Sequence, residues 1–350
     1  MDFTRSTVAR IDMPYPLGTL TLDGERCVVA STEDHGPILL SRPPYQEAHP
    51  VVEGPGGSMA LVEDPDRPGE LFAIMGCFLG YRFQTGAVYH LLRDGPRAGD
   101  PWRATRILEL PFAHRIAPVR RGGARWLLAA SLAADKRDPA DWSQPGTLVA
   151  SRMPKKPGDP WEFAPVLSGI HRHHGMRAGR FMGRPCILVS GTEGLFAADL
   201  STDGTRWDFE RVMESEVSEI AVLDIDGDGV EELVTIEPFH GNTLRIYRRD
   251  ASRWSRIWET GLEFGHCLWA GSFGGAPGIL ASNRAGNRDL LLFQWKGHAP
   301  ADRGLPDPER TVVDAGVGAA NMLVLEHGGG ELIFSTNQVT GEIACYRPAG

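Results

Sequence analysis

The segment from Asp224 to Leu233 holds the densest group of possible metal ligands in the sequence. Three carboxylates at alternate positions of a glycine-containing turn can point at one centre and offer the oxygen ligands that Ca²⁺ takes. We expect a Ca²⁺ site whose ligands are the side chains of Asp224, Asp226, Asp228 and Glu232 and the carbonyl oxygen of Val230. An EF-hand loop would carry Glu at its twelfth position, where this chain has Thr235. Strand-like residues flank the segment, so the ion would lie in a β-hairpin turn and offset the repulsion between the carboxylates. An acidic turn without metal is the alternative.

A second group of possible ligands consists of histidines that lie far apart in the sequence. Histidines from different strands can bind Zn²⁺ or Mn²⁺ through neutral ring nitrogens and leave coordination positions open for a substrate. Histidine is also the side chain best suited to proton transfer near neutral pH. Whether these residues meet depends on the elements that carry them.

The composition favours many short strands joined by turns. The 350 residues include 42 glycines and 26 prolines, and no long segment has helical periodicity. The net charge of -9 and the absence of a Lys/Arg-rich run exclude the usual pattern of a nucleic-acid-binding protein. The five cysteines are an odd number, mostly within apolar strands, and we expect them to be buried and reduced. The N-terminus does not resemble a signal peptide and no apolar run approaches ~18 residues, so we expect a soluble cytoplasmic protein without membrane partners.

Seven apolar strands that end in small or polar residues recur along the chain. Their starts are separated by 44, 55, 60, 47, 45 and 54 residues, and they lie at Cys27, Leu71, Trp126, Cys186, Leu233, Gly278 and Leu332. These spacings are close to the ~40 to 50 residues of a four-stranded propeller blade. Each recurring strand, strand B, follows another apolar strand, which we take as the innermost strand A. The segment Arg5 to Met13 can supply the fourth strand of the last blade and close the ring. The sequence therefore predicts an all-β fold, a single seven-bladed β-propeller over residues 1–350; two β-sandwiches would not explain seven comparable units.

In a propeller, the start of strand A and the end of strand B lie at the same end of each blade. This rule brings four histidines to one mouth of the central channel: His114, His174, His240 and His266. It also brings polar residues that we expect to bind a substrate: Asn283, Arg284, Asn321 and Asn337. The Asp224 loop is a turn between strands A and B and belongs to the opposite face.

Within this mouth we interpret three histidines as ligands of a divalent metal such as Zn²⁺, Mn²⁺ or Mg²⁺: His174, His240 and His266. His114 would transfer protons and Arg115 would stabilise an oxyanion. Tyr81, on an insertion after the second recurring strand, could act as an acid or stack on a sugar. A second insertion, Ala133 to Gly146, would lie over the same face. His171 and His173 are expected to be solvated.

Several motifs around these residues are similar to those of one enzyme family. They are Pro111-Phe-Ala-His114-Arg115-Ile, Asp141-Trp142-Ser143-x-Pro145-Gly146, His174-Gly175, Glu237-Pro-Phe-His240-Gly241, His266-Cys-Leu-Trp269 and Arg288-Asp289-Leu-Leu-Leu-Phe293. The chain from about Ser58 onward resembles the propeller of aldos-2-ulose dehydratase (1,5-anhydro-D-fructose dehydratase) and its bacterial FG-GAP/VCBS-repeat relatives. The resemblance implies a lyase that removes water from a keto-sugar by β-elimination with the help of a metal. The cupin-like domains of that family have no counterpart in this sequence, so an isomerase step that they perform is not expected.

Other functions are compatible with the same residues. A sugar epimerase or isomerase, or a uronate or glycoside lyase, would pass through the same enolate. A non-catalytic propeller would use the rim to bind a ligand or a protein. A small carbohydrate-like molecule is the expected partner in the catalytic case.

Overall fold

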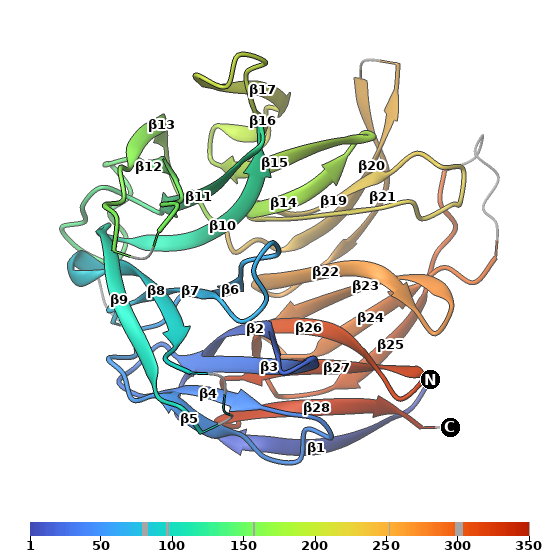
Figure 1. The fold of residues 1–350 in the computed structure, drawn as a ribbon. Helices are drawn as coiled ribbons and strands as arrows, with labels where there is room; N and C mark the ends of the chain where they lie inside the picture. Colours follow the sequence, from blue (N-terminus) through green and yellow to red (C-terminus); the bar gives the residue numbers. More distant parts are fainter. Residues whose placement is uncertain are drawn as a thin grey trace.

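Seven four-stranded antiparallel sheets form a ring in the computed structural model of the chain, which confirms the predicted seven-bladed propeller (Figure 1). The structure describes residues 1–78, 83–95, 97, 99–156, 158–251, 253–297 and 304–349. Tyr81 lies outside these residues. None of the described helical segments has the length and apolarity needed to cross a membrane.

The strands follow one another blade by blade. The first three blades contain β2 (Pro14–Leu22), β3 (Glu25–Thr32), β4 (Ile38–Ser41) and β5 (His49–Val52); β6 (Ala60–Glu63), β7 (Leu71–Met75), β8 (Ala87–Arg93) and β9 (Trp102–Glu109), with the short helix η1 (Phe83–Thr85); and β10 (Ala113–Arg121), β11 (Ala124–Ser131), β12 (Gly146–Arg152) and β13 (Ala164–Ile170). The next three contain β14 (Met176–Phe181), β15 (Arg184–Gly191), β16 (Gly194–Leu200) and β17 (Trp207–Met213); β18 (Glu219–Leu223), β19 (Glu232–Glu237), β20 (Thr243–Asp250) and β21 (Arg253–Gly261); and β22 (Gly265–Phe273), β23 (Ala276–Asn283), β24 (Leu290–Gln294) and β25 (Glu309–Asp314). The seventh contains β26 (Ala319–His327), β27 (Gly330–Asn337), β28 (Glu342–Pro348) and the N-terminal β1 (Phe3–Arg10).

The N-terminal strand closes the ring, as predicted. β1 pairs antiparallel with β28 and completes the sheet ordered β1-β28-β27-β26. The strand ends at Arg10 rather than Met13, because Met13 has a left-handed φ of 47° and Pro14 already begins β2. The pairing joins the two ends of the chain in one sheet and covers the outer edge of β28.

The recurring apolar strands are the second strands of the seven blades: β3, β7, β11, β15, β19, β23 and β27. All of Leu71–Met75 is buried, as is the whole of β19. Apolar clusters join neighbouring blades, as where Leu128 of the third blade packs with Ile187 of the fourth. A second strand has a neighbouring blade on both of its faces, so its sequence is a continuous apolar run rather than an alternating one.

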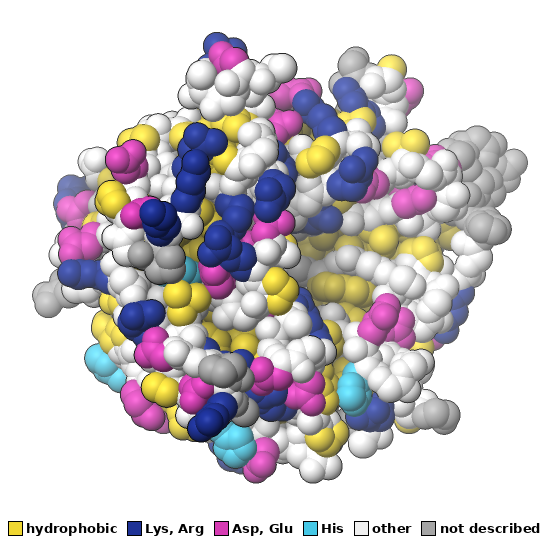
Figure 2. All heavy atoms as spheres, in the orientation of Figure 1, with side chains coloured by type: hydrophobic (Ala, Val, Ile, Leu, Met, Phe, Trp, Pro, Cys, Tyr) yellow, Lys and Arg dark blue, Asp and Glu magenta, His cyan; other side chains and the backbone are white. Residues whose placement is uncertain are grey.

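The remaining composition-based expectations concern the core and the surface. All five cysteines are buried and free, as predicted. On the face drawn in Figure 2, Lys and Arg side chains are interspersed with Asp and Glu and are densest over β10 and β14. Ion pairs such as Arg120 with Asp66 (2.9 Å) and Arg121 with Asp199 (3.2 Å) show that opposite charges are matched locally.

Candidate active site

A pocket of about 290 Å³ lies at the end of the propeller where the first strands of the blades begin. Residues before or at first strands, residues just after second strands, and the insertion between β11 and β12 form its wall. They are Tyr15, Glu33, Met59, Cys77, Phe112, Ala113, His114, Leu132, Lys136, Pro139, Trp142, His174, Phe239, His240, His266 and Arg284. The four histidines that the strand rule assigned to one mouth therefore share one pocket.

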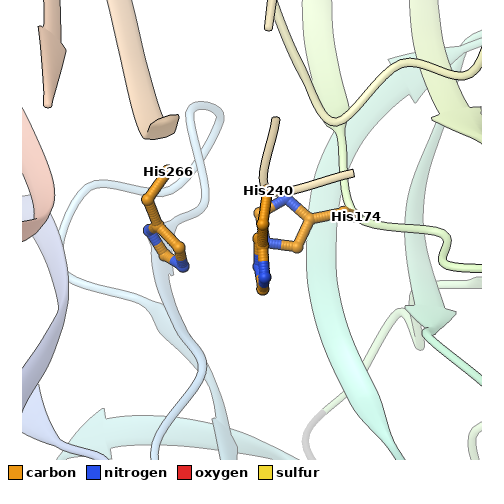
Figure 3. A group of neighbouring side chains, drawn as sticks. All are labelled: His174, His240 and His266. Atoms are coloured by element: carbon orange, nitrogen blue, oxygen red, sulfur yellow. The ribbon is translucent and has the colours of Figure 1, made fainter. Parts of the chain in front are cut away.

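Three of these histidines form a group that could hold a metal ion: His174, His240 and His266. One ring nitrogen of each lies within 4.8 Å of the others. The rings come from separate segments and turn toward one another (Figure 3). Nitrogens bound to one tetrahedral Zn²⁺ would be about 3.4 Å apart, given Zn–N bonds of about 2.0–2.1 Å. The limit of 4.8 Å lies above that spacing.

His174 has the hydrogen-bond pattern of a metal ligand. Its Nδ1 is 2.8 Å from Oε1 of Glu219 and 3.3 Å from the carbonyl oxygen of Ser218, so Nδ1 carries the proton and donates it. The Nε2 atom is buried and has no partner among the described residues. A histidine that donates one N–H to a carboxylate is oriented, and made more basic, at its other nitrogen. The free Nε2 of His174 thus fits a metal ion, and an unsatisfied buried nitrogen without one is costly.

His266 is oriented in the same way by the seventh blade. Its Nδ1 donates to the carbonyl oxygen of Ala320 at 2.8 Å, which leaves the lone pair on Nε2. That Nε2 lies 3.3 Å from the hydroxyl of Tyr15, which can donate to it. Burial raises the pKa of Tyr15, so the hydroxyl keeps its proton. Tyr15 is therefore a proton donor beside the histidine group.

His240 reaches the group from the segment after β19. It has a left-handed φ of 48°, which is uncommon for a residue other than glycine. Its backbone N–H donates to Oγ of Ser218 at 3.2 Å, and its ring stacks on Phe239 with centroids 3.9 Å apart. Such a conformation persists only where neighbouring contacts impose it, and here it turns the ring toward His174.

Burial keeps the histidines of the pocket neutral. It lowers the pKa of His240 to about 2 and that of His114 and His266 well below the usual value, and the nearby arginines and other histidines act in the same direction. Both ring nitrogens of His114 are buried without a partner among the described residues, and its ring centre is 4.5 Å from that of His174. Neutral imidazoles are the form that binds metals.

Glycines next to the histidines allow the backbones to approach closely. A Cβ at Gly175 would lie 2.7 Å from the carbonyl oxygen of Ser218, and one at Gly241 would lie 2.1 Å from that of Glu237. No side chain fits at these distances, so the His-Gly pairs of the sequence reflect packing as well as chemistry.

The pocket lining also carries cationic and aromatic side chains. Lys136 comes from the insertion between β11 and β12, and its Nζ lies 3.5 Å from the centre of the Trp142 ring. Trp142 contacts Phe239 with centroids 5.1 Å apart. Arg284 donates to Oε1 of Gln338. The insertion predicted to lie over this face does so.

Several residues predicted for the site have other surroundings. Arg115 does not line the pocket; its Nη2 is 2.5 Å from Oε1 of Glu219, and we correct its expected role from oxyanion binding to holding that carboxylate. Asn321 also lies behind the wall and donates to the carbonyl oxygen of Tyr15 at 2.9 Å. His173, expected to be solvated, is fully buried, whereas His171 pairs with Glu193 at 2.6 Å.

The other two asparagines face away from the pocket lining. Asn283 accepts a hydrogen bond from the backbone of Glu263 at 2.9 Å. Asn337 is fully buried and donates to the hydroxyl of Tyr346 at 2.8 Å. Of the four predicted substrate-binding residues, the structure places Arg284 at the pocket.

Three residues of the site were missed although the strand rule covers them. Tyr15 and Glu219 stand at the starts of β2 and β18, and Glu33 follows β3. A search of the same positions for any titratable side chain, rather than for histidines and amides, would have found them.

The Asp224 loop joins β18 to β19 at the opposite end of the fifth blade, in the predicted hairpin. Oxygens of Asp224, Asp226 and Glu232 lie within 4.8 Å of one another, but Asp228 is not part of this group. The guanidinium of Arg248 contacts both Asp226 and Glu232, the latter at 3.1 Å. Asp224 accepts the backbone N–H groups of Gly227 (2.8 Å) and Gly229 (3.0 Å). Arg248 therefore supplies part of the positive charge that offsets the repulsion between these carboxylates, which the sequence had led us to expect from Ca²⁺ alone.

Comparisons with known proteins bear on the fold. No protein-family model matches the chain, and no curated protein matches it. Among solved structures it is similar to the β-propeller domain of Cps50 (Swd1) from Myceliophteria thermophila, with a TM-score of 0.60 and 10% sequence identity over 99% of this chain and 100% of that one. At this identity the similarity shows the fold alone, and the chain is a seven-bladed β-propeller.

Proposed function

We propose that the pocket is the active site of a metal-dependent lyase that eliminates water from a keto-sugar or a related sugar derivative. One observation carries the proposal: the buried Nε2 of His174 has no partner among the described residues, while Glu219 holds its Nδ1. The nearby nitrogens of His240 and His266 supply the other two protein ligands. The resemblance of the histidine motifs to those of aldos-2-ulose dehydratase supports the same reaction class.

A divalent metal on the three histidines would polarise a carbonyl or hydroxyl oxygen and acidify the neighbouring C–H bond. The residues of the chain then handle protons and exclude water. Tyr15 keeps its proton and can donate it to a leaving hydroxide or an oxyanion. The aromatic wall of Trp142 and Phe239 shields the reacting atoms from solvent.

Two residues are candidates for the base that removes the proton. His114 is neutral and has free ring nitrogens, but its lowered pKa makes it a weak base. Glu33 also lines the pocket, and burial raises the pKa of its carboxyl, which makes it a stronger base than an exposed glutamate. Comparing His114→Gln with Glu33→Gln assigns the role: the variant that loses turnover while keeping its metal and its melting temperature lacks the base.

The metal requirement is tested first. Purified protein is stripped with a chelator, incubated with Zn²⁺ or Mn²⁺, desalted and examined by elemental analysis. One tightly bound transition metal per chain, lost in His174→Ala, is the expected result. Protein that retains no transition metal refutes the proposal.

The reaction is tested with a panel of keto-sugars and glycosides by following enone absorbance. An epimerase or isomerase would exchange the substrate's C–H with deuterium from solvent without forming an enone. Metal-loaded protein that neither forms an enone nor exchanges a proton would favour the alternative of a non-catalytic binding propeller.

A further inference from the structure

We infer that the pocket is built for an anionic substrate, a small hydroxylated carboxylate such as a sugar acid, and that Lys136 binds its carboxylate. The inference rests on the proposed function, since it names the substrate class of the same site. It depends on the charged side chains that line the pocket together with the histidines.

Lys136 is a buried ammonium group without a carboxylate partner. Its side chain is 7% exposed, and Nζ donates to the carbonyl oxygen of Pro139 at 2.6 Å and lies over Trp142. No ion pair within the described part of the chain includes Lys136. The three carboxylates of the same loop have other partners: Asp135 accepts the backbone N–H of Lys136 at 2.8 Å, Asp138 accepts that of Ala140 at 2.9 Å, and Asp141 is bound by Arg137 at 2.7 Å. A buried cation that lacks a counter-ion is costly, and an anionic ligand would remove that cost.

Arg284 is the second cation of the pocket lining and is partly buried. Arg284 donates to the side chain of Gln338, which in turn donates to Glu33. Arg284 has no carboxylate of its own within ion-pair distance among the residues described. Glu33 is the one acidic side chain in the described lining, against two cations and four neutral histidines. The pocket is therefore positive before any metal ion is added.

The position of Lys136 suits a role in specificity. It lies on the insertion between β11 and β12 rather than on the blade framework, and the same insertion brings Trp142 to the wall. A six-membered sugar ring can pack against such aromatic surface while its carboxylate reaches the ammonium group. Lys136 is thus a substrate-binding residue, separate from the groups that hold the metal.

Matched pairs of ligands test this inference by calorimetry. Three hexuronates (D-glucuronate, D-galacturonate and D-mannuronate) are titrated against their uncharged hexuronamides, into both chelator-stripped and metal-loaded protein. We expect at least one acid to bind about 10-fold or more tighter than its amide, the size of one charge-assisted hydrogen bond. Lys136→Met should remove the difference without weakening the amide. Lys155→Met, at an exposed lysine on another loop, is the matched control and should leave it intact.

Three outcomes overturn the inference: equal binding of acid and amide, an unchanged difference in Lys136→Met, or no binding of any acid. Metal content is measured on the same samples. Acid-selective, Lys136-dependent binding by protein that takes up no transition metal would refute the proposed function and leave this inference standing. A metal-bound protein that prefers the amides would refute this inference and leave the proposed function standing.

Discussion

The two ends of the propeller each gather three potential metal ligands within the same 4.8 Å limit, but the ligands differ in what else they bind. At the pocket, Nε2 of His174 is left without a partner while its other nitrogen is held in place. At the Asp224 loop, backbone N–H groups and Arg248 already occupy the carboxylate oxygens. A group of donors that lie close together is thus a weaker sign of a metal than a donor whose hydrogen-bonding capacity is unused.

The largest effect is expected from removing a histidine of the pocket. His174→Ala or His266→Ala should lower the affinity for Zn²⁺ or Mn²⁺ by more than about 100-fold, which exceeds the effect of losing an outer partner. Competition with a chromophoric chelator measures the affinity. His114→Ala should keep the metal, and His171→Ala, at a partly exposed histidine that pairs with Glu193, is the control. If all four variants bind metal alike, the contrast between the two ends of the molecule disappears.

The next effect concerns the carboxylate behind His174. Glu219→Gln keeps a hydrogen-bond acceptor for Nδ1 but removes its charge, so metal affinity should fall by roughly 10- to 100-fold. Glu216→Gln is a matched control, because Glu216 lies nearby and pairs with Arg172 at 3.1 Å without touching the histidines. An unchanged affinity in Glu219→Gln would mean that the carboxylate serves Arg115 alone.

A smaller effect tests the tight backbone packing at the histidine end. Gly241→Ala would place a methyl group 2.1 Å from the carbonyl oxygen of Glu237 and should destabilise the fold by roughly 1–3 kcal/mol in urea unfolding. Gly261→Ala, where no atom lies within 4 Å of the added Cβ, should stay within about 0.5 kcal/mol of the parent. Equal effects would show that the close approach at Gly241 does not set the packing of this segment.

The smallest effect is expected at the acidic loop. We propose that Ca²⁺ binds there weakly, since it must compete with Arg248 for Asp226 and Glu232. A roughly tenfold excess over the dissociation constant would stabilise the fold by about 1.4 kcal/mol and raise the melting temperature by only a few °C. The measurement is made in His174→Ala, so that chelation at the pocket does not contribute. Arg248→Met should enlarge the response, and Asp224→Asn should abolish it; a response that persists in Asp224→Asn would place the ion elsewhere.

The fold was predictable because every second strand carries the same unbroken apolar signal. β19 and, from Leu332 onward, β27 are buried on both faces, and the spacing of such runs reveals the repeat without any knowledge of the turns. The position of the pocket was predictable from the repeat, because the order of strands in each blade decides which strand ends lie at the same end of the propeller. This is why His114 and His266, 152 positions apart in the sequence, could be assigned to one site.

Side-chain direction and cross-strand pairing were not predictable in the same way. Asn283 and Asn337 are the last residues of second strands, and Arg284 is the first residue after one. Successive side chains of a strand point to opposite sides, so a shift of one position decides whether a side chain faces the blade or the channel. Arg248 reaches Glu232 because β19 and β20 pair Leu233 with Tyr247, a register that the loop between them sets. The charge balance of the acidic loop therefore depended on a residue outside its own motif.

Closure of the ring by β1 has a consequence for the order of events during folding. His266 is oriented by Ala320, and the backbone of Tyr15 is held by Asn321 and Thr336, all in the last blade. That blade needs strands from both ends of the chain, including contacts such as that of Arg5 in β1 with Glu342 in β28, across 337 positions. Such long-range pairing forms slowly, because loop closure must precede it. Metal binding would then be a late step that follows synthesis of the final strand. The rate of metal binding would report the rate at which the ring is completed.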